Sequence, residues 1–307
     1  IIPEPFYANY NGFAKAAGVK VVPVTANIED GFALPPISDF EKKITPKTKA
    51  IIVVHLYGQA CDMDAIMAVA KKHNLKVIED TAQAFGTKYQ GQEGVFSAGT
   101  IGDIGTYSFY PTKNMSCAGD GGMVTTNCDE LNKRLRRIRV HGSDRRYYHD
   151  ELGVNSRLDE IQAAVLRIKL KYINSWNERR AKLAEIYNQE FSKLNNESFE
   201  IETPKTINES NHIYHQYSIK VKSKTEKTDR EVRDALKDAL KEEGIASEVY
   251  YPLSLHEQEI YKELGYQASD LPNSVKATET VLCLPIYPEL EEADILAVVN
   301  AIKAASL

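Results

Sequence analysis

Residues 76–86 read KVIEDTAQAFG, a short run of β-branched and apolar residues that ends on two acids and continues into small residues. A second apolar run, KAIIVV, occupies positions 49–54, and between the two runs residues 62–72 carry apolar side chains at helical spacing. Asp62, at the start of that segment, is a residue type that caps helix N-termini. This order of strand, helix and strand predicts an α/β fold with a mostly parallel sheet flanked by helices.

The rest of the chain contains further predicted strands and helices, which divide into a large domain and a smaller lobe. Residues 106–110 and 121–126 are predicted strands, and a long helical pattern from 158 to about 194 is expected to break near 173–175. We therefore expect a large domain over residues 1–174 and a smaller α/β lobe over 175–307. The predicted elements of the smaller lobe are strands at 217–221 and 247–251 and helices at 229–243 and 291–305.

Composition excludes several classes of protein. The chain has 307 residues and a formal net charge of -5, which disfavours a general nucleic-acid binder because such proteins neutralise phosphates. Apolar runs are too short to span a bilayer, no signal peptide is visible at the start, and we expect a cytoplasmic protein. The absence of an initial Met suggests that the sequence begins inside a longer protein. The four cysteines form no CxxC pattern, so neither a metal site nor a disulfide framework is expected.

Ligands of parallel sheets bind beyond the carboxyl ends of the strands, which directs attention to His55, Asp80 and Lys113. Lys113 lies in SFYPTKN, a turn between a predicted strand and a glycine-rich segment. A lysine after a strand is usually a solvated surface residue. Held in a tight turn and partly desolvated, however, it would have a lowered pKa and a larger share of neutral, nucleophilic amine. That is what a lysine needs to form a Schiff base.

Three more positions near these strand ends have two interpretations each. Asp80 either caps the following helix or pairs with the pyridine nitrogen of pyridoxal phosphate (PLP), whose ring accepts electrons from the substrate carbon. Gln83 is either an exposed residue or a donor to the oxygen on that ring. Ser108 either faces a neighbouring strand or binds a phosphate oxygen. Neither a P-loop nor GxGxxG is present, so nucleoside triphosphates and nicotinamide cofactors have no support.

Taken together, several stretches resemble the DegT/DnrJ/EryC1/StrS family of sugar aminotransferases from about residue 52 to the C-terminus. The stretches that carry the resemblance are VVHLYGQACDMDAI (53–66), KVIEDTAQAFGTKYQG (76–91), IGDIGTYSFYPTKNMSCAGDGGMVTTN (101–127), RVHGSDRRYYHDELGVNSRLDEIQAAVLRIKL (139–170), YYPLSLHEQEIYKELGY (250–266) and VLCLPIYPEL (281–290).

The resemblance implies a fold-type-I PLP-dependent transferase that acts as a homodimer with shared active sites. By this resemblance Lys113 is the Schiff-base lysine, Asp80 the partner of the pyridine nitrogen, Gln83 a contact of the ring oxygen and Ser108 a phosphate ligand. Family members usually transfer an amino group from glutamate to a keto carbon of a nucleotide-linked sugar. Within the 139–170 stretch, HGSDRRYYHDELGVNSRLD (141–159) looks more like the sequence of members that aminate C-3 than of those that aminate C-4.

The same resemblance assigns residues to the substrate and to the partner subunit. Asn155, in GVNSRLD, would reach the phosphate of the other subunit's cofactor, and Arg157 would help to bind an anionic donor or the sugar. Tyr251 and His256, in the 250–266 stretch, are expected to contact substrate.

Two departures from the family stand out. The Ser-Gly-Thr loop that the family carries upstream, which binds the cofactor phosphate, is not among these residues. Residues 1–50 resemble class I/II amino-acid aminotransferases instead, and by that likeness Tyr7, in PFYANY, stacks on the PLP ring; otherwise it is a core tyrosine.

Three other functions remain open on the sequence alone. A dehydratase of the same family commonly has His in place of the lysine, so Lys113 argues against it. An amino-acid aminotransferase is favoured only by residues 1–50. A catalytically inactive or regulatory homologue, or an inactive fragment, is favoured by the missing phosphate loop. Such homologues usually lose the lysine or the aspartate, and this chain has both.

Overall fold

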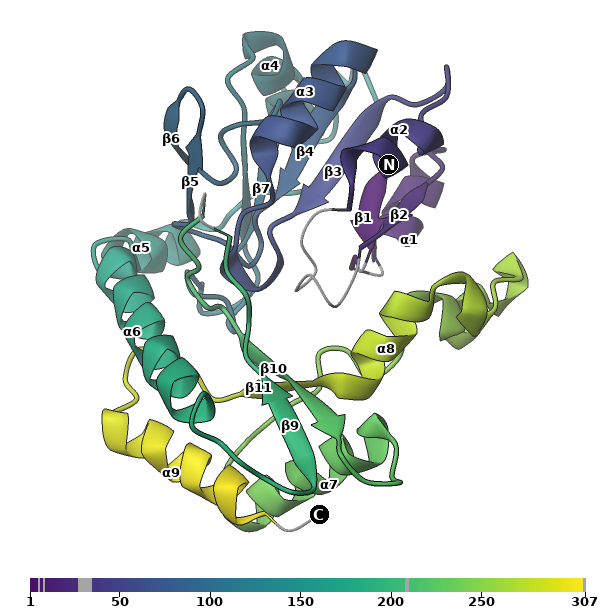
Figure 1. The fold of residues 1–307 in the computed structure, drawn as a ribbon. Helices are drawn as coiled ribbons and strands as arrows, with labels where there is room; N and C mark the ends of the chain where they lie inside the picture. Colours follow the sequence, from purple (N-terminus) through teal and green to yellow (C-terminus); the bar gives the residue numbers. More distant parts are fainter. Residues whose placement is uncertain (5, 8, 27–34, 208–209, 306–307) are drawn as a thin grey trace.

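The computed structural model describes residues 1–4, 6–7, 9–26, 35–207 and 210–305. Figure 1 shows two lobes, an upper one from the first half of the chain and a lower one from the second half, with the long helix α6 (Ile173–Phe191) beside both. The upper lobe contains a four-stranded sheet of order β3-β4-β7-β8. Its strands are β3 (Ala50–Val54), β4 (Lys76–Asp80), β7 (Ile104–Ser108) and β8 (Gly122–Thr125).

The sheet has the mostly parallel character that the apolar strands predict. β3, β4 and β7 are parallel, and β8 runs antiparallel to β7. A parallel pair, β1 (Ile2–Glu4) and β2 (Pro23–Thr25), extends it beside β3, where the N–H of Ile52 donates to the carbonyl of Ile1 at 2.8 Å. A hairpin of β5 (Lys88–Gly91) and β6 (Gly94–Ser97) stands apart from this sheet.

Helices cover the upper sheet, as its nearly all-apolar strands require. Asp62 caps α3, because its carboxylate accepts from the N–H of Ala65 at 3.1 Å, and the buried face of α3 packs on the strands. The predicted long helix is two helices that separate at residues 170–172, slightly before the expected break. The helices of this half are α1 (Asn9–Ala16), α2 (Ile37–Lys43), η1 (Leu56–Gly58), α3 (Met63–His73), α4 (Asp129–Ile138), α5 (Glu160–Lys169) and α6 (Ile173–Phe191).

The lower lobe is built on an antiparallel sheet of order β11-β10-β9, whose strands are β9 (Phe199–Glu202), β10 (Tyr217–Ser223) and β11 (Val281–Leu284). A single apolar core joins this sheet to α6, α7 (Asp229–Glu242), α8 (Pro272–Thr280) and α9 (Glu292–Ala304). The strand predicted over 247–251 is wrong, because only Glu248 forms an isolated bridge, to Cys283. The remaining helices are η2 (Leu255–Glu257), η3 (Glu259–Leu264) and η4 (Ala268–Asp270).

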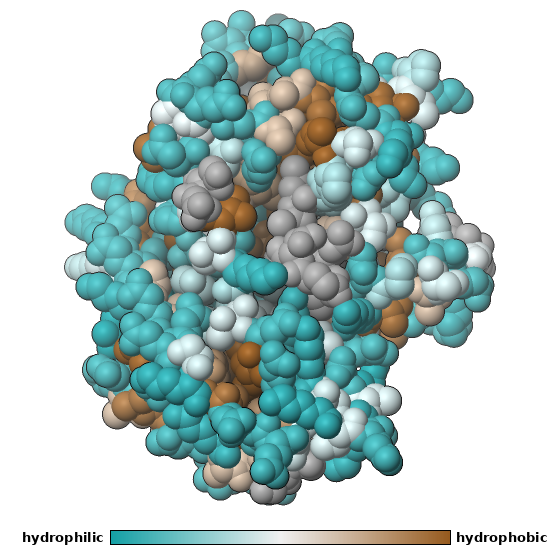
Figure 2. Space-filling model, viewed as in Figure 1, coloured by the Kyte–Doolittle hydropathy of each residue, from teal (hydrophilic) through white to brown (hydrophobic). Residues whose placement is uncertain are grey.

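The two lobes have separate apolar cores. One core lies between the upper sheet and α3, and the other surrounds β10 and the later turns of α6. The first turns of α6, with Ile173 and Trp176, belong to a third, smaller cluster next to Phe109. Figure 2 shows mainly hydrophilic side chains over the visible face, with hydrophobic ones in small areas. No helix within the described residues is long and apolar enough to cross a membrane.

Candidate active site

The carboxyl ends of the parallel strands open into a cavity of about 550 Å³ between the two lobes. From the upper lobe it is lined by residues that follow β4 and β7, and from the lower lobe by the segment 250–258. Seven of the nine residues expected at the site line this cavity. They are Tyr7, Asp80, Gln83, Ser108, Lys113, Tyr251 and His256.

Asp80 ends β4 and holds two hydrogen bonds within its own chain. One carboxylate oxygen accepts from the Tyr10 hydroxyl at 2.5 Å, and the other accepts from the N–H of Ala82 at 2.9 Å. Burial and the adjacent Asp80 charge both raise the pKa of Tyr10, so the phenol remains a proton donor. These two donors fix the orientation of the carboxylate. Sequence reasoning did not predict Tyr10, although it lies in the same PFYANY stretch as Tyr7.

Lys113 lies in the turn that connects β7 with β8. Its N–H donates to the carbonyl of Tyr110 at 2.9 Å, and the N–H of Phe109 donates to the carbonyl of Gly121 at 2.8 Å, so the turn is held at both ends. Burial lowers the pKa of the Lys113 amine, and the negative charge of Asp80 opposes this shift. The turn therefore presents a partly desolvated amine to the same cavity as the Asp80 carboxylate.

Gln83 and Ser108 complete the polar side of the cavity. The side-chain carbonyl of Gln83 accepts from the N–H of Tyr57 at 2.7 Å. Because this bond uses the oxygen of the amide, the NH₂ donors are directed away from it, toward a ligand. The Ser108 hydroxyl accepts a long bond of 3.4 Å from the N–H of Tyr110 and can still donate to an anion.

A chain of buried amides ties the turn of Lys113 to the lower lobe. Asn114, which follows the lysine, accepts from His215 Nδ1 at 3.0 Å and donates to Asn177 Oδ1 at 3.0 Å. Asn177 in turn donates to the carbonyl of Phe85 at 3.0 Å. Burial lowers the pKa of His215 to about 3, and the positive charges of Lys113 and Arg180 act in the same direction. His215 is therefore neutral at pH 7, with its proton on Nδ1.

His55 does not line the cavity, although the strand-end rule directed attention to it. It is fully buried behind β4, and its Nε2 lies 3.0 Å from the Glu79 carboxylate. Glu79 also accepts from the backbone N–H groups of Gly99, Ile101 and Gly102. Burial acts to raise the pKa of Glu79, but the hydrogen bond with His55 and those backbone donors lower it on balance. The interaction between His55 and Glu79 therefore holds β4, the strand that ends at Asp80, in place.

Asn155 and Arg157 are not brought into this cavity. Both side chains are exposed, on a segment that follows α4 and folds back on itself through an isolated bridge between Val140 and Asn155. The same segment exposes apolar surface, since Leu152 is 98% and Tyr147 78% exposed.

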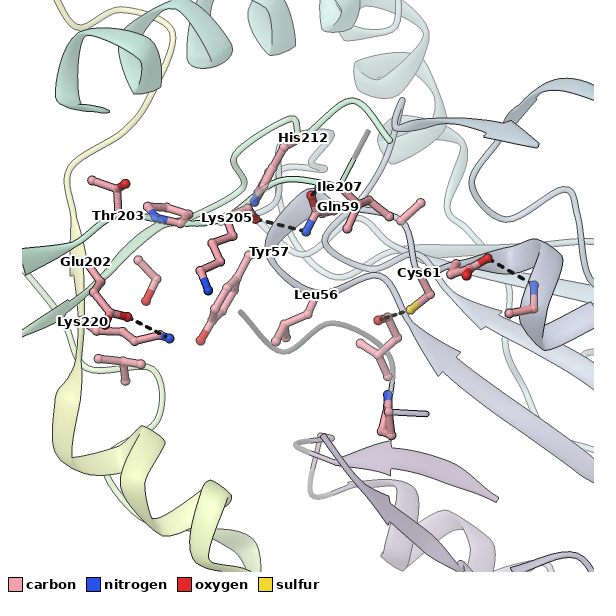
Figure 3. Close-up of a pocket in the computed structure, with 18 of the residues that line it drawn as sticks. Leu56, Tyr57, Gln59, Cys61, Glu202, Thr203, Lys205, Ile207, His212 and Lys220 are labelled. Carbon is pink, nitrogen blue, oxygen red and sulfur yellow. Dashed lines mark hydrogen bonds and ion pairs between the residues drawn. The ribbon is translucent and has the colours of Figure 1, made fainter. Parts of the chain in front are cut away.

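A second cavity of about 480 Å³ lies against the first one (Figure 3). Its walls include Gln59, Lys205 and His212, and Glu202 forms an ion pair with Lys220 at 3.2 Å along one side. Sequence reasoning did not predict this cavity, because its walls come from segments about 150 residues apart in the chain. Among the described residues, no group of three or more His, Cys, Asp or Glu side chains is placed to hold a metal ion.

Comparison with known proteins places this geometry in one family. The family model for the DegT/DnrJ/EryC1/StrS aminotransferase family matches residues 5–303. The match includes most of residues 1–50, so the likeness to this family begins far earlier than the expected start near residue 52.

Individual relatives match over nearly the whole chain. The pleiotropic regulatory protein of Geobacillus stearothermophilus is 45% identical, with 94% of this chain and 72% of that protein covered. The UDP-N-acetyl-3-dehydro-alpha-D-glucosamine 3-aminotransferase of Acidithiobacillus ferrooxidans is 42% identical, with 93% and 72% covered.

Among solved structures, DesV of S. venezuelae in complex with a ketimine intermediate superposes with a TM-score of 0.87. It has 37% identity to this chain, of which 98% is covered, together with 77% of DesV. The fold is thus that of the fold-type-I enzymes, as the resemblance implied. The chain belongs to the DegT/DnrJ/EryC1/StrS family of PLP-dependent aminotransferases.

Proposed function

We propose that this chain transfers an amino group from glutamate to the C-3 keto group of a nucleotide-linked sugar, giving an amino-sugar. The observation that carries the proposal is the convergence of Asp80 and Lys113, from the ends of β4 and β7, on one cavity. The activity for which the Acidithiobacillus relative is named, 3-amination of a UDP-linked 3-dehydro sugar, supports both the substrate class and the carbon that is aminated.

The residues around the cavity fit PLP by their chemistry. Asp80 offers a fixed carboxylate for the pyridine nitrogen, and Gln83 offers amide donors for the ring oxygen. Ser108 offers a hydroxyl for the phosphate, and Tyr7, an exposed aromatic on the cavity wall, offers a face for the ring. When bound, PLP supplies an acceptor for the electrons released at the substrate carbon.

Lys113 is the residue that moves protons in this proposal. Its lowered pKa increases the share of neutral amine near pH 7, and a neutral Nζ can accept a proton from the α-carbon of glutamate. In the second half of the reaction the same Nζ returns a proton to the sugar carbon. The two hydrogen bonds on Asp80 keep its charge in place throughout, so the carboxylate does not need to reorganise during either step.

The substrate and the second subunit are assigned to residues at the rim. We propose that Tyr251 and His256, on the lower-lobe wall, contact the sugar. Asn155 and Arg157 would act in the cavity of a partner subunit, which agrees with their exposure on a segment that also exposes Leu152. The working form would then be a cytoplasmic homodimer, with each chain divided into lobes at about residue 174.

Turnover with a defined acceptor tests this function. The chain is incubated with PLP, glutamate and a UDP-linked 3-keto sugar, and 2-oxoglutarate and the amino-sugar are measured by mass spectrometry. Equal amounts of both products support the proposal. 2-Oxoglutarate without an amino-sugar would retain the donor but reject the acceptor. Neither product, from a folded chain that binds PLP, would contradict the proposal.

A regulatory protein without catalytic turnover is the second candidate. It is favoured by the similarity to the Geobacillus relative, which is named a pleiotropic regulatory protein. The two functions make different predictions for Lys113→Ala. The substitution abolishes the function of an enzyme, whereas it leaves a regulator that does not need the amine able to complement a deletion strain.

A further inference from the structure

Tyr57 lies between the two cavities and contributes to the walls of both. The cavity that contains Lys113 and the second cavity share Val54, Leu56, Tyr57 and Val281 as lining residues. Of these four, Tyr57 has the largest side chain and is the one with a polar end. Figure 3 shows its ring reaching across the space beside Lys205 and Leu56. The ring therefore forms much of the partition between about 550 Å³ and about 480 Å³ of space.

Hydrogen bonds from three different segments hold Tyr57 in this position. Its N–H donates to the side-chain carbonyl of Gln83 at 2.7 Å, and its carbonyl accepts from the N–H of His215 at 2.8 Å. Its hydroxyl donates to the carbonyl of Tyr250 at 2.6 Å. Both lobes thus fix the residue, and rotating the ring away would break the bond at its tip.

The backbone at this point is also held in an unusual conformation. Tyr57 has a φ of 55° and a ψ of 7°, in the left-handed region that a bulky residue rarely adopts. The next residue, Gly58, has a φ of 104°, and an added Cβ would lie 2.7 Å from Ile213 Cγ1 and 3.1 Å from the His215 nitrogen. The backbone at Tyr57 and Gly58 is therefore packed directly against the segment that carries Ile213 and His215.

We propose that Tyr57 sets the size of sugar that the active site accepts, by closing the Lys113 cavity against the second cavity. This proposal rests on the proposed function for the class of ligand, a nucleotide-linked sugar. Without the ring, the two cavities become one space, and the second cavity can receive an acyl chain carried by the sugar. The wild-type chain, by contrast, accepts an acetyl group and rejects longer acyl chains.

Binding of two unreactive nucleotide sugars tests the proposal without any turnover. UDP-N-acetylglucosamine and UDP-N-hexanoylglucosamine are titrated calorimetrically into the PLP-loaded wild type, Tyr57→Gly and the matched control Tyr57→Phe. Glycine adopts positive φ without strain, and phenylalanine keeps the ring while losing the hydroxyl bond. We compare the affinity for UDP-N-hexanoylglucosamine with the affinity for UDP-N-acetylglucosamine in each protein. We expect this ratio to rise by at least about tenfold in Tyr57→Gly, since apolar pockets discriminate by about that factor per methylene. We expect no rise in Tyr57→Phe.

The opposite results are equally defined. An equal ratio in all three proteins, an equal gain in the Phe and Gly variants, or no binding of either sugar to any of them would overturn the proposal. If Tyr57→Gly does not fold, Tyr57→Asn replaces it, because Asn also tolerates this backbone region. If Tyr57→Gly gains relative affinity for the hexanoyl sugar but the wild type forms no amino-sugar from a keto acceptor, the role of Tyr57 is supported and the proposed transamination is contradicted.

Discussion

Removing the Asn114 side chain should weaken both the fold and the site, because this amide connects three segments. In Asn114→Ala, His215 loses the acceptor for its Nδ1–H, and Asn177 loses the donor to its Oδ1. Asn177 is 6% exposed, and Asn114 itself is 9% exposed, so water has little access to the groups that are left. Each buried group without a partner costs about 1–3 kcal/mol. We therefore expect the free energy of unfolding to fall by about 2–4 kcal/mol.

Urea unfolding with a double-mutant cycle measures this effect. The cycle compares Asn114→Ala, His215→Leu and the double variant, with Asn174→Ala as a control on an exposed asparagine of α6. A coupling energy of at least about 1 kcal/mol between the two sites is expected for residues in direct contact. A loss within about 0.5 kcal/mol for Asn114→Ala, which is typical of surface substitutions, or a coupling near zero would refute the reasoning.

Three further predictions follow from buried groups. Burial lowers the pKa of both His212 and His215 to about 3, so the unfolded chain binds more protons below pH 6.5. Between pH 6.5 and pH 3 the free energy of unfolding should therefore fall as the pH falls, by at most about 1.4 kcal/mol per pH unit for each histidine. Urea unfolding at several pH values should show a smaller dependence of this free energy on pH in His212→Asn. In Glu79→Gln the backbone N–H groups of the loop at 99–102 face a neutral amide instead of a carboxylate. Thermal unfolding should show that the free energy of unfolding falls by about 1.5–3 kcal/mol. Arg233→Met leaves the carbonyls of Thr278 and Val281 without the donor they share. Chemical unfolding should show that the free energy of unfolding falls by about 2 kcal/mol or more. An unchanged denaturant midpoint would contradict this prediction.

The strand-end residues could be predicted from the sequence because one rule locates them. Apolar runs of strand length end at Asp80 and shortly before Lys113, and parallel strands bring their carboxyl ends to one edge of a sheet. The same rule was too broad for His55, which also follows a strand. The rule locates the end of a strand but not the direction of the side chain that follows it. The side chain of His55 faces the buried Glu79 carboxylate and not the cavity.

The remaining parts of the site depend on contacts between distant segments. Tyr10 reaches Asp80 over a separation of 70 residues, and no local pattern distinguishes it from Tyr7. The segment at 247–251 has strand composition, but the sheet of the lower lobe bonds it only at Glu248, and its tyrosines line the cavity instead. The assignments of Asn155 and Arg157 stay predictions, because both side chains are exposed and neither lines the cavity.

An absorption spectrum of the purified chain with added PLP, recorded before and after glutamate is added, tests whether Lys113 binds the cofactor. We expect a visible band from cofactor bound to Lys113, and we expect glutamate to bleach it. The band should be absent in Lys113→Ala and retained in Lys171→Ala, a control on an exposed lysine. A folded wild-type chain without the band, or a band that survives Lys113→Ala and still responds to glutamate, would contradict the assignment of Lys113 and with it the proposed reaction.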